Sequence, residues 1–128
     1  MLPDTILKKH AVPFQWGVSD CVTMAADMIE YLTGMRPSVP AYSTEREALL
    51  VRSFKPLSEA VIESLGPVQH ATTAEYGDIV LTAFAEYGEM LGVADPPVFW
   101  IKTDRGIMAL DMTLASGVFK CQARSSRS

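Results

Sequence analysis

The 128-residue sequence predicts a single α+β domain in which N-terminal helices pack on a C-terminal antiparallel β-sheet. Two observations support this prediction. Apolar residues recur at helical spacing in the first half, whereas the second half consists of short runs rich in β-branched and aromatic residues, separated by Gly, Asp or Pro. Helices followed by a series of strands are typical of α+β folds. We expect residues 1–124 to form the domain and residues 125–128 to be a disordered tail.

The first half contains two clear helix signals. The stretch PDTILKKH predicts a short helix with Pro3 in its first turn. A longer helix begins at Ser19 or Asp20, since either side chain can accept hydrogen bonds from the unpaired N–H groups of a first turn. It ends at Gly34, with Pro37 soon after. This helix is apolar around most of its circumference, which indicates that it is the buried central helix.

The elements that follow are shorter. Residues 43–54 and 57–66 predict two amphipathic helices, the first with Thr44 and Glu47 in the spacing of a capping box. Residues 67–77 then predict a loop, and the stretch TDRG at 103–106 predicts a hairpin turn. Strands are predicted at residues 78–84, 90–95, 97–103, 106–112 and 117–124.

Charge and hydropathy exclude several classes of protein. The formal net charge of −4 argues against nucleic acid as a partner. No apolar run is long enough to cross a bilayer. The N-terminus lacks the basic-then-apolar order of a signal peptide. We therefore expect a cytoplasmic protein, or one assembled into a phage-like particle from the cytoplasm.

The two cysteines, Cys21 and Cys121, do not have the spacing of a zinc site, and no histidine cluster accompanies them. A cytosolic compartment disfavours a disulfide between them. We expect two thiols, no metal ion and no cofactor.

Cys21 stands where the central helix begins, directly after PFQWGVSD. The unpaired N–H groups and the dipole of a helix N-terminus favour a thiolate there, and the thiolate is the nucleophilic form. A cysteine peptidase uses this arrangement, together with a base from the sheet and a polar group that orients the base. The alternative is that Cys21 is a small apolar core residue beside a helix cap.

These motifs resemble the NlpC/P60 superfamily of cysteine peptidases, which has a papain-like fold. In that superfamily a Gly-x-x-Asp-Cys turn leads into a helix, as in WGVSDCVTMAAD, and a Gly-Asp pair opens the first core strand, as in YGDIVL. The combination of PFQWGVSDC, AAD, YSTEREAL, YGDIVL and LGVAD is similar to a family of small phage and prophage proteins, often encoded beside tail-assembly genes. This resemblance extends from about Pro13 to about Leu110.

The resemblance places Cys21 on the nucleophile and Asp20 on the acidic residue before it. The pair Gly77-Asp78 falls on the Gly-Asp pair. The superfamily's catalytic histidine opens the next strand in a His-x-Gly-apolar pattern, where this sequence reads MLGV from Met90. A thioether cannot accept a proton, so Met90 cannot be the general base. The third catalytic position, a polar residue on the following strand, falls near GIMALD.

Two histidines are left as candidate bases. His70 lies in the predicted loop before the strand at 78–84, and His10 lies in the N-terminal segment. The alternative for each is an exposed or incidentally bonded histidine. Trp16 is expected to anchor the turn before Cys21 by packing, with a substrate platform as the alternative, and Met90 would border the same substrate groove.

The resemblance therefore implies a phage or prophage tail protein with a degenerate cysteine-peptidase site, acting as a structural or adaptor component among tail proteins. The alternative is an active cysteine hydrolase of cell-wall peptidoglycan peptides, with Cys21 as nucleophile and His70 as a displaced base. A third alternative is thiol-based acyl transfer or amidase activity on a small substrate.

Overall fold

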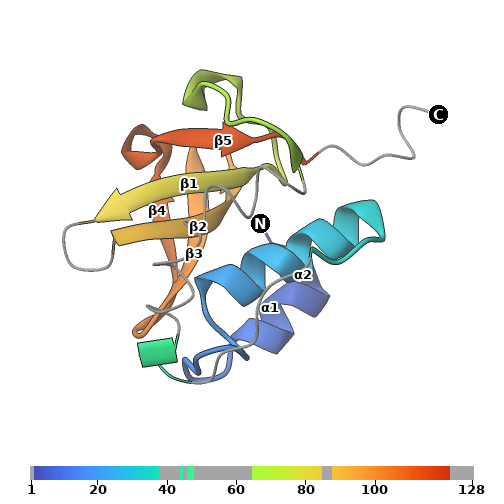
Figure 1. Cartoon of the computed structure of the whole chain (residues 1–128), viewed down its shortest axis with the longest axis vertical. Coiled ribbons are helices and arrows are strands. Elements are labelled where there is room, and N and C mark those ends of the chain that lie inside the picture. The colour runs from blue at the N-terminus through green and yellow to red at the C-terminus, as the bar shows by residue number, and fades with distance from the viewer. Residues whose placement is uncertain (1, 38–43, 45, 48–64, 85–87, 122–128) are drawn as a thin grey trace.

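The computed structural model describes residues 2–37, 44, 46–47, 65–84 and 88–121. This part of the chain has two α-helices followed by five β-strands, together with two short 3-10 helices (Figure 1). The α-helices are α1 (Asp4–His10) and α2 (Cys21–Thr33). The strands are β1 (Ile79–Phe84), β2 (Gly88–Asp95), β3 (Val98–Thr103), β4 (Gly106–Asp111) and β5 (Gly117–Phe119), and the 3-10 helices are η1 (Ala71–Thr73) and η2 (Met112–Leu114). The predicted α+β class is confirmed.

The strands form one antiparallel sheet in the order β4-β3-β2-β1-β5. β1 to β4 form a meander, and β5 returns to pair with the outer edge of β1. α2 packs on β2 and β3, and α1 packs on α2. Both helices therefore cover the same side of the sheet, with α2 over its middle strands (Figure 1).

The boundaries of α2 agree with the sequence signals. Asp20 is the N-cap, and Gly34 closes the helix in the left-handed conformation while its N–H donates to the Glu30 carbonyl. The helices predicted at 43–54 and 57–66 lie almost entirely outside the described residues. In the described part of the first, the Glu47 N–H donates to Thr44 Oγ1 over 3.1 Å, which is one half of the predicted capping box.

Two strands differ from their predicted lengths by more than one residue. β2 begins earlier than predicted, at Gly88, because its pairing with β1 continues to Phe84. β5 is shorter than predicted and ends at Phe119, because Phe119 pairs with Ile79, the first residue of β1, and the next two residues bond the side chain of Asp78 instead. Residues 122–124 of that predicted strand lie outside the described residues.

The hydrophobic core lies between α2 and the sheet and is closed at one end by α1. Met24 and Met28 of α2 and Phe99 and Ile101 of β3 are completely buried. Burial of apolar surface at about 25 cal/mol per Å² is the main force that holds such layers together. Both cysteines, Cys21 and Cys121, belong to this core.

Gly92, in the LGV stretch of β2, is fixed by packing. A β-carbon on this residue would lie 2.8 Å from the Trp100 carbonyl oxygen and 2.9 Å from a ring carbon of Phe99. We therefore expect Gly92→Ala to lower the free energy of unfolding by about 1–3 kcal/mol through overpacking. Urea denaturation checks this, with Ala83→Val as the control, since Ala83 is exposed on the neighbouring strand. If Gly92→Ala is as stable as the wild type, β2 and β3 can accommodate the added methyl group without a loss of folding free energy, and the packing argument is wrong.

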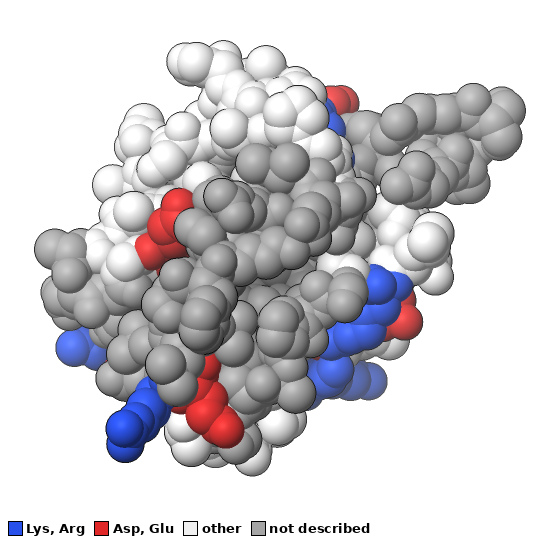
Figure 2. Space-filling view, viewed as in Figure 1, with Lys and Arg blue, Asp and Glu red and all other residues white. Residues whose placement is uncertain are grey.

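The described surface carries charges of both signs. On the face shown in Figure 2, charged side chains gather mainly over the lower, helical half, and the upper part over β5 and η1 is mostly uncharged. Over the lower half, Lys and Arg side chains (blue) are interspersed with Asp and Glu side chains (red), so the described residues form no large basic patch on this face. A basic patch is the usual footprint of a nucleic-acid-binding surface. No helix within the described residues is long and apolar enough to span a membrane.

Candidate functional site

The turn before α2 is closed by the backbone. The Ser19 N–H donates to the Gln15 carbonyl over 2.8 Å, and the Gln15 N–H donates to the Ser19 carbonyl over 3.1 Å. The Gly17 N–H donates to Asp20 Oδ2 over 2.8 Å. The predicted turn is thus a fixed loop that leads straight into the helix.

Asp20 and Thr23 form a reciprocal capping box at the start of α2. The Thr23 N–H donates to Asp20 Oδ1 over 2.8 Å, and the Asp20 N–H donates to Thr23 Oγ1 over 2.8 Å. Each bond satisfies a backbone donor that the helix itself cannot pair. The predicted capping role of Asp20 is confirmed. Both of its carboxylate oxygens hold backbone N–H groups, one in the helix and one in the preceding turn.

We expect Asp20→Ala to lower the free energy of unfolding by about 1–2 kcal/mol, because the cap and the tie to Gly17 are both lost. Asp20→Asn is the matched variant: its amide oxygen can still cap Thr23, but its NH₂ group cannot accept from Gly17. Its loss of stability should be smaller. Urea denaturation of the two variants measures this difference, and a fully stable Asp20→Ala protein would contradict the assigned role.

Cys21 is the first residue of α2 and is only 4% exposed. Its thiol lies in the hydrophobic core rather than on an open surface. Met90, at the position that the resemblance assigns to the catalytic histidine, is buried in the same core and pairs with Thr82 of β1. No thiolate–imidazole pair can form at that position.

His70 is exposed and lies directly before η1. Its Nδ1 is 2.8 Å from the Thr72 hydroxyl, and it also accepts the Thr72 N–H. The neighbouring Gln69 pairs with Val118 of β5, so this segment lies along the β5 edge of the sheet. Figure 1 places the yellow-green segment that contains η1 beyond β5, on the other side of β1 from the start of α2. The structure does not bring His70 to Cys21.

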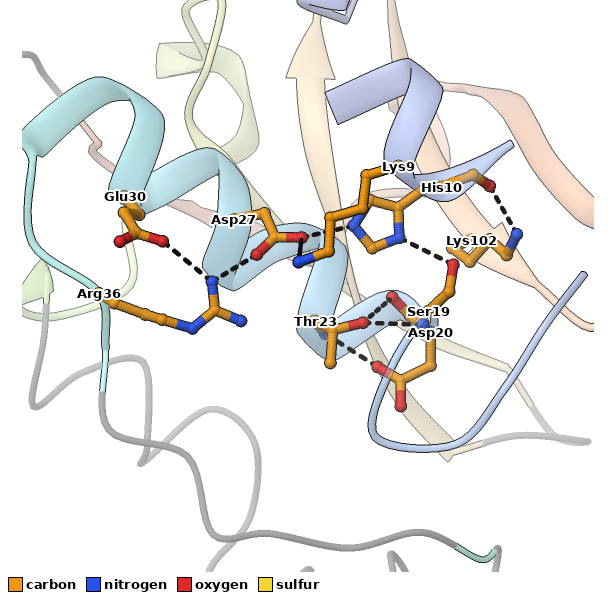
Figure 3. A network of polar contacts seen from close by, with 9 residues as sticks. All are labelled: Lys9, His10, Ser19, Asp20, Thr23, Asp27, Glu30, Arg36 and Lys102. Carbon is orange, nitrogen blue, oxygen red and sulfur yellow. Dashed lines mark hydrogen bonds and ion pairs between the residues drawn. The ribbon is translucent and has the colours of Figure 1, made fainter. Parts of the chain in front are cut away.

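His10 has a different environment from the one expected. It is completely buried, and both ring nitrogens have partners (Figure 3). Nε2 lies 2.6 Å from Asp27 Oδ2, and Nδ1 lies 2.9 Å from Ser19 Oγ. The expectation of an exposed His10 is wrong, and its hydrogen bonds join the end of α1 to the turn and to α2.

Asp27 is the anionic centre of this network. Lys9 lies 2.9 Å from its Oδ2, and Arg36 pairs with its Oδ1. Burial acts to raise the pKa of Asp27, but the hydrogen bonds from Arg36, Lys9 and His10 together outweigh it, so the pKa lies below its ordinary value. Asp27 is therefore ionised at neutral pH, and its charge is balanced by cations from two other segments.

Lys102, at the end of β3, is buried beside the same network. Its ammonium donates to the His10 carbonyl over 2.6 Å and to the Val12 carbonyl over 2.5 Å. Burial lowers the pKa of Lys102. The two carbonyl partners lie at and just beyond the C-terminal end of α1, where a helix favours a cation. Lys102 thereby fixes the end of α1 to the sheet.

Ser19, His10 and Asp27 have the connectivity of a hydrolytic Ser-His-Asp triad. However, Ser19 is only 1% exposed and His10 is fully buried, so a substrate carbonyl cannot reach the hydroxyl in this conformation. The arrangement can hold a proton and fix a ring orientation. It cannot perform acyl transfer without opening.

The remaining predicted residues, Trp16 and Cys121, pack against other parts of the protein. Trp16 is half-buried and packs edge-on against Phe14 with ring centroids 4.8 Å apart, as expected of an anchor for the turn. Cys121 is a buried thiol, as is Cys21. Within the described residues, no group of histidine, cysteine or acidic side chains could hold a metal ion.

The pair Gly77-Asp78 joins three segments. Gly77 has φ of +90°, and a β-carbon there would lie 2.7 Å from Leu32 of α2. Asp78 is fully buried and accepts from the Glu75 and Cys121 N–H groups over 2.8 and 3.0 Å. It also pairs with Lys120. The conformation and contacts of this pair account for the YGD motif without a catalytic role.

A family model described as a domain of unknown function (DUF6950) matches residues 1–121. The chain belongs to this family. Searches of curated proteins and of solved structures found no significant match. The DUF6950 domain contains the whole helix-start turn, the His10 network and the Asp78 contacts.

Sequence reasoning missed the centre of this DUF6950 site. It gave no role to Asp27 or Lys102, and it considered Ser19 only as one of two possible caps of the helix. A signal for Asp27 was present, because it is the Asp of the AAD motif. A carboxylate in an otherwise apolar helix needs a buried partner. No comparable signal identifies Lys102, whose partners are backbone carbonyls 90 and 92 residues away in the sequence.

Proposed function

We propose that this DUF6950 protein is a non-catalytic relative of the NlpC/P60 cysteine peptidases, with a papain-like fold, and that it acts as a structural or adaptor protein of a phage or prophage tail. The proposal rests on the burial of the thiol and on where the two histidines are bonded. The thiol at the start of α2 is buried, and both histidines of the chain are bonded elsewhere, one to Ser19 and Asp27 and the other to Thr72.

Peptide cleavage by a thiol requires a base to activate it and an acid to protonate the leaving amine. General acid–base help contributes about 10²–10⁴-fold to such reactions. Met90 cannot supply it, and His70 lies along the β5 edge. The buried His10 ring already shares its nitrogens with Ser19 and Asp27. The arrangement of these residues therefore favours a protein that has kept the fold of a cysteine peptidase but lacks the acid–base group needed for peptide cleavage.

The roles of the motif residues support the same conclusion. Asp20 caps α2, Asp27 anchors α1, Asp78 ties the C-terminal segment to the loop before β1, and Gly92 allows two strands to approach. These residues lie in the motifs that resemble the phage family. Each has a role in maintaining the fold, which is what a structural tail component needs.

The papain-like arrangement is supported by the placement of α2. A helix that begins with a cysteine packs across the middle strands of an antiparallel sheet. The Gly-Asp pair directly precedes β1, and the LGV stretch lies on β2, which pairs with β1. These are the relative positions that the resemblance implies.

The proposal is tested first by the rate of Cys21 alkylation by iodoacetamide against pH, in a Cys121→Ser background. We expect slow alkylation, because the thiol is buried, and no change in the pH profile on His70→Ala. A low thiolate pKa that rises in His70→Ala would overturn the proposal. That result would favour the active cysteine hydrolase of peptidoglycan peptides, with Cys21 and His70 as its dyad.

The tail role is tested in a phage that encodes this protein. Deletion of the gene should give particles without functional tails. A Cys21→Ser gene should restore infectivity as fully as the wild-type gene, because the thiol performs no reaction. Tails that assemble normally in the deletion would contradict an adaptor role, and failure of Cys21→Ser alone would indicate chemistry at the thiol.

A further inference from the structure

His10 is the point at which four segments meet. It is the last residue of α1, its ring bonds Ser19 of the turn and Asp27 of α2, and its carbonyl accepts from Lys102 of β3. Ser19 in turn is paired with Gln15 through both backbone bonds of the loop that leads to Cys21. A change in the His10 ring is therefore transmitted directly to the segment before the thiol.

The hydrogen bond with Asp27 places a hydrogen on Nε2 of the His10 ring, and a neutral ring leaves Nδ1 as the acceptor of the Ser19 hydroxyl. The Asp27 carboxylate can only accept, so Nε2 must carry the hydrogen. In the neutral ring Nδ1 is then an acceptor, and the Ser19 hydroxyl donates to it. A protonated ring would present an N–H to Ser19 Oγ instead. The hydroxyl hydrogen would then have to find another acceptor at a site that is 1% exposed.

The charges around the ring also oppose protonation. Among the described residues, the charged side chains that face this network are Asp27, Lys9, Arg36, Glu30 and Lys102. Burial lowers the pKa of His10, and Lys9 and Lys102 lower it further, while Asp27 opposes the shift without cancelling it. A proton on His10 would add a positive charge to a buried site where Lys9 and Arg36 already pair with the Asp27 carboxylate and the Lys102 ammonium bonds the His10 carbonyl.

We propose that His10 is a pH-operated latch, in which protonation of the ring removes the acceptor of the Ser19 hydroxyl hydrogen, frees the turn at residues 15–19 and exposes Cys21. The latch is closed in the structure described here, with the ring neutral and the thiol buried. In the open form the imidazolium keeps its ion pair with Asp27 or leaves for solvent, and the turn loses its tie to α1. The latch does not depend on whether the thiol performs a reaction.

The direction of the pH effect follows from linkage. Because the closed fold lowers the pKa of His10 below the ordinary value of 6.5, the open form binds the proton more tightly. The latch is fully closed above the open-state pKa, and it opens progressively as the pH falls from there through the closed-state pKa. Acidification can raise the opening equilibrium constant by about tenfold for each unit by which the fold lowers the pKa.

The first test is an NMR titration of the imidazole nitrogens in the wild-type protein. The chain has two histidines, so only two ring systems give signals. We expect His10 to be neutral at pH 7 with its proton on Nε2, and to titrate below 6.5. A His10 ring that is protonated at pH 7, or that carries its proton on Nδ1, would overturn the latch.

The second test measures exposure of Cys21 with 4,4′-dithiodipyridine, which reacts with thiols under acidic conditions, in the Cys121→Ser protein. Rates are divided by those of a short peptide with a free cysteine at the same pH. We expect the normalised rate to rise on acidification with the midpoint of the His10 titration. A flat normalised rate through that titration would contradict the latch.

His10→Gln supplies the matched variant, because its amide can donate to Asp27 and accept from Ser19 but does not titrate. Its normalised rate should stay constant between pH 7 and pH 5. If His10→Gln does not fold, hydrogen exchange of the amides at residues 17–23 in the wild type replaces it. Exchange there should accelerate on acidification, after correction for intrinsic rates, and unchanged protection would overturn the proposal. If Cys21 proved to hydrolyse peptides, the proposed non-catalytic function would be wrong, but the results expected from these tests of the latch would not change.

Discussion

Asp27→Ala is expected to lower the free energy of unfolding by about 3–5 kcal/mol, the range observed when one partner is removed from a buried charge pair. The carboxylate holds Lys9, His10 and Arg36. Its removal leaves the buried Nε2–H of His10 without this acceptor, takes the Asp27 counter-charge from Lys9, and leaves Arg36 with the exposed Glu30. Equilibrium urea denaturation, followed by circular dichroism, measures the change.

Glu30→Ala is the matched control for this variant. Glu30 lies on the same helix and contacts the same Arg36, but its side chain is 50% exposed whereas that of Asp27 is 6% exposed. An exposed ion pair contributes about 0–1 kcal/mol. We therefore expect a change of less than about 1 kcal/mol in Glu30→Ala. Equal losses in the two variants would show that burial of the Asp27 network does not determine its contribution.

Asp78→Ala is expected to have a similar effect, with a loss of about 2–5 kcal/mol. Its carboxylate accepts two backbone N–H groups and pairs with Lys120, whose ammonium also donates to the Thr73 carbonyl. The substitution leaves those N–H groups without their acceptor in a buried site. It also releases the residues after β5 from the loop before β1.

The control for Asp78 is Glu75→Ala. Glu75 pairs with the same Lys120 over 2.9 Å, but its side chain is 65% exposed and Asp78 is fully buried. Its backbone N–H, which bonds Asp78, is unaffected by the substitution. We expect Glu75→Ala to fall within about 1 kcal/mol of the wild type. A stable Asp78→Ala protein would mean that the Gly-Asp motif has a role outside the fold.

The elements of this fold were largely predictable because their signals are local. The cap at Asp20, the stop at Gly34 and the short runs of β-branched and aromatic residues in the strands depend on residues that are neighbours in the sequence. The end of β5 was not predictable in this way. It depends on the bond between the Cys121 N–H and Asp78, which are 43 residues apart.

The site was predicted less well than the fold, for a related reason. Cys21 and Asp20 were placed correctly at the helix start, because a cap and its helix are adjacent in sequence. Histidine at position 10 carries no local sign of burial, and its partners come from α2 and the preceding turn. The lack of a general base at Met90 could be predicted directly from the sequence, because a thioether cannot accept a proton in any conformation of the chain.

The measurement that tests the central claim most directly is incubation of the protein with peptidoglycan fragments, with mass-spectrometric detection of products, for the wild type and Cys21→Ser. The account predicts that both proteins leave the fragments intact over the same period. Cleavage by the wild type that disappears in Cys21→Ser would contradict it, and would identify Cys21 as a working nucleophile.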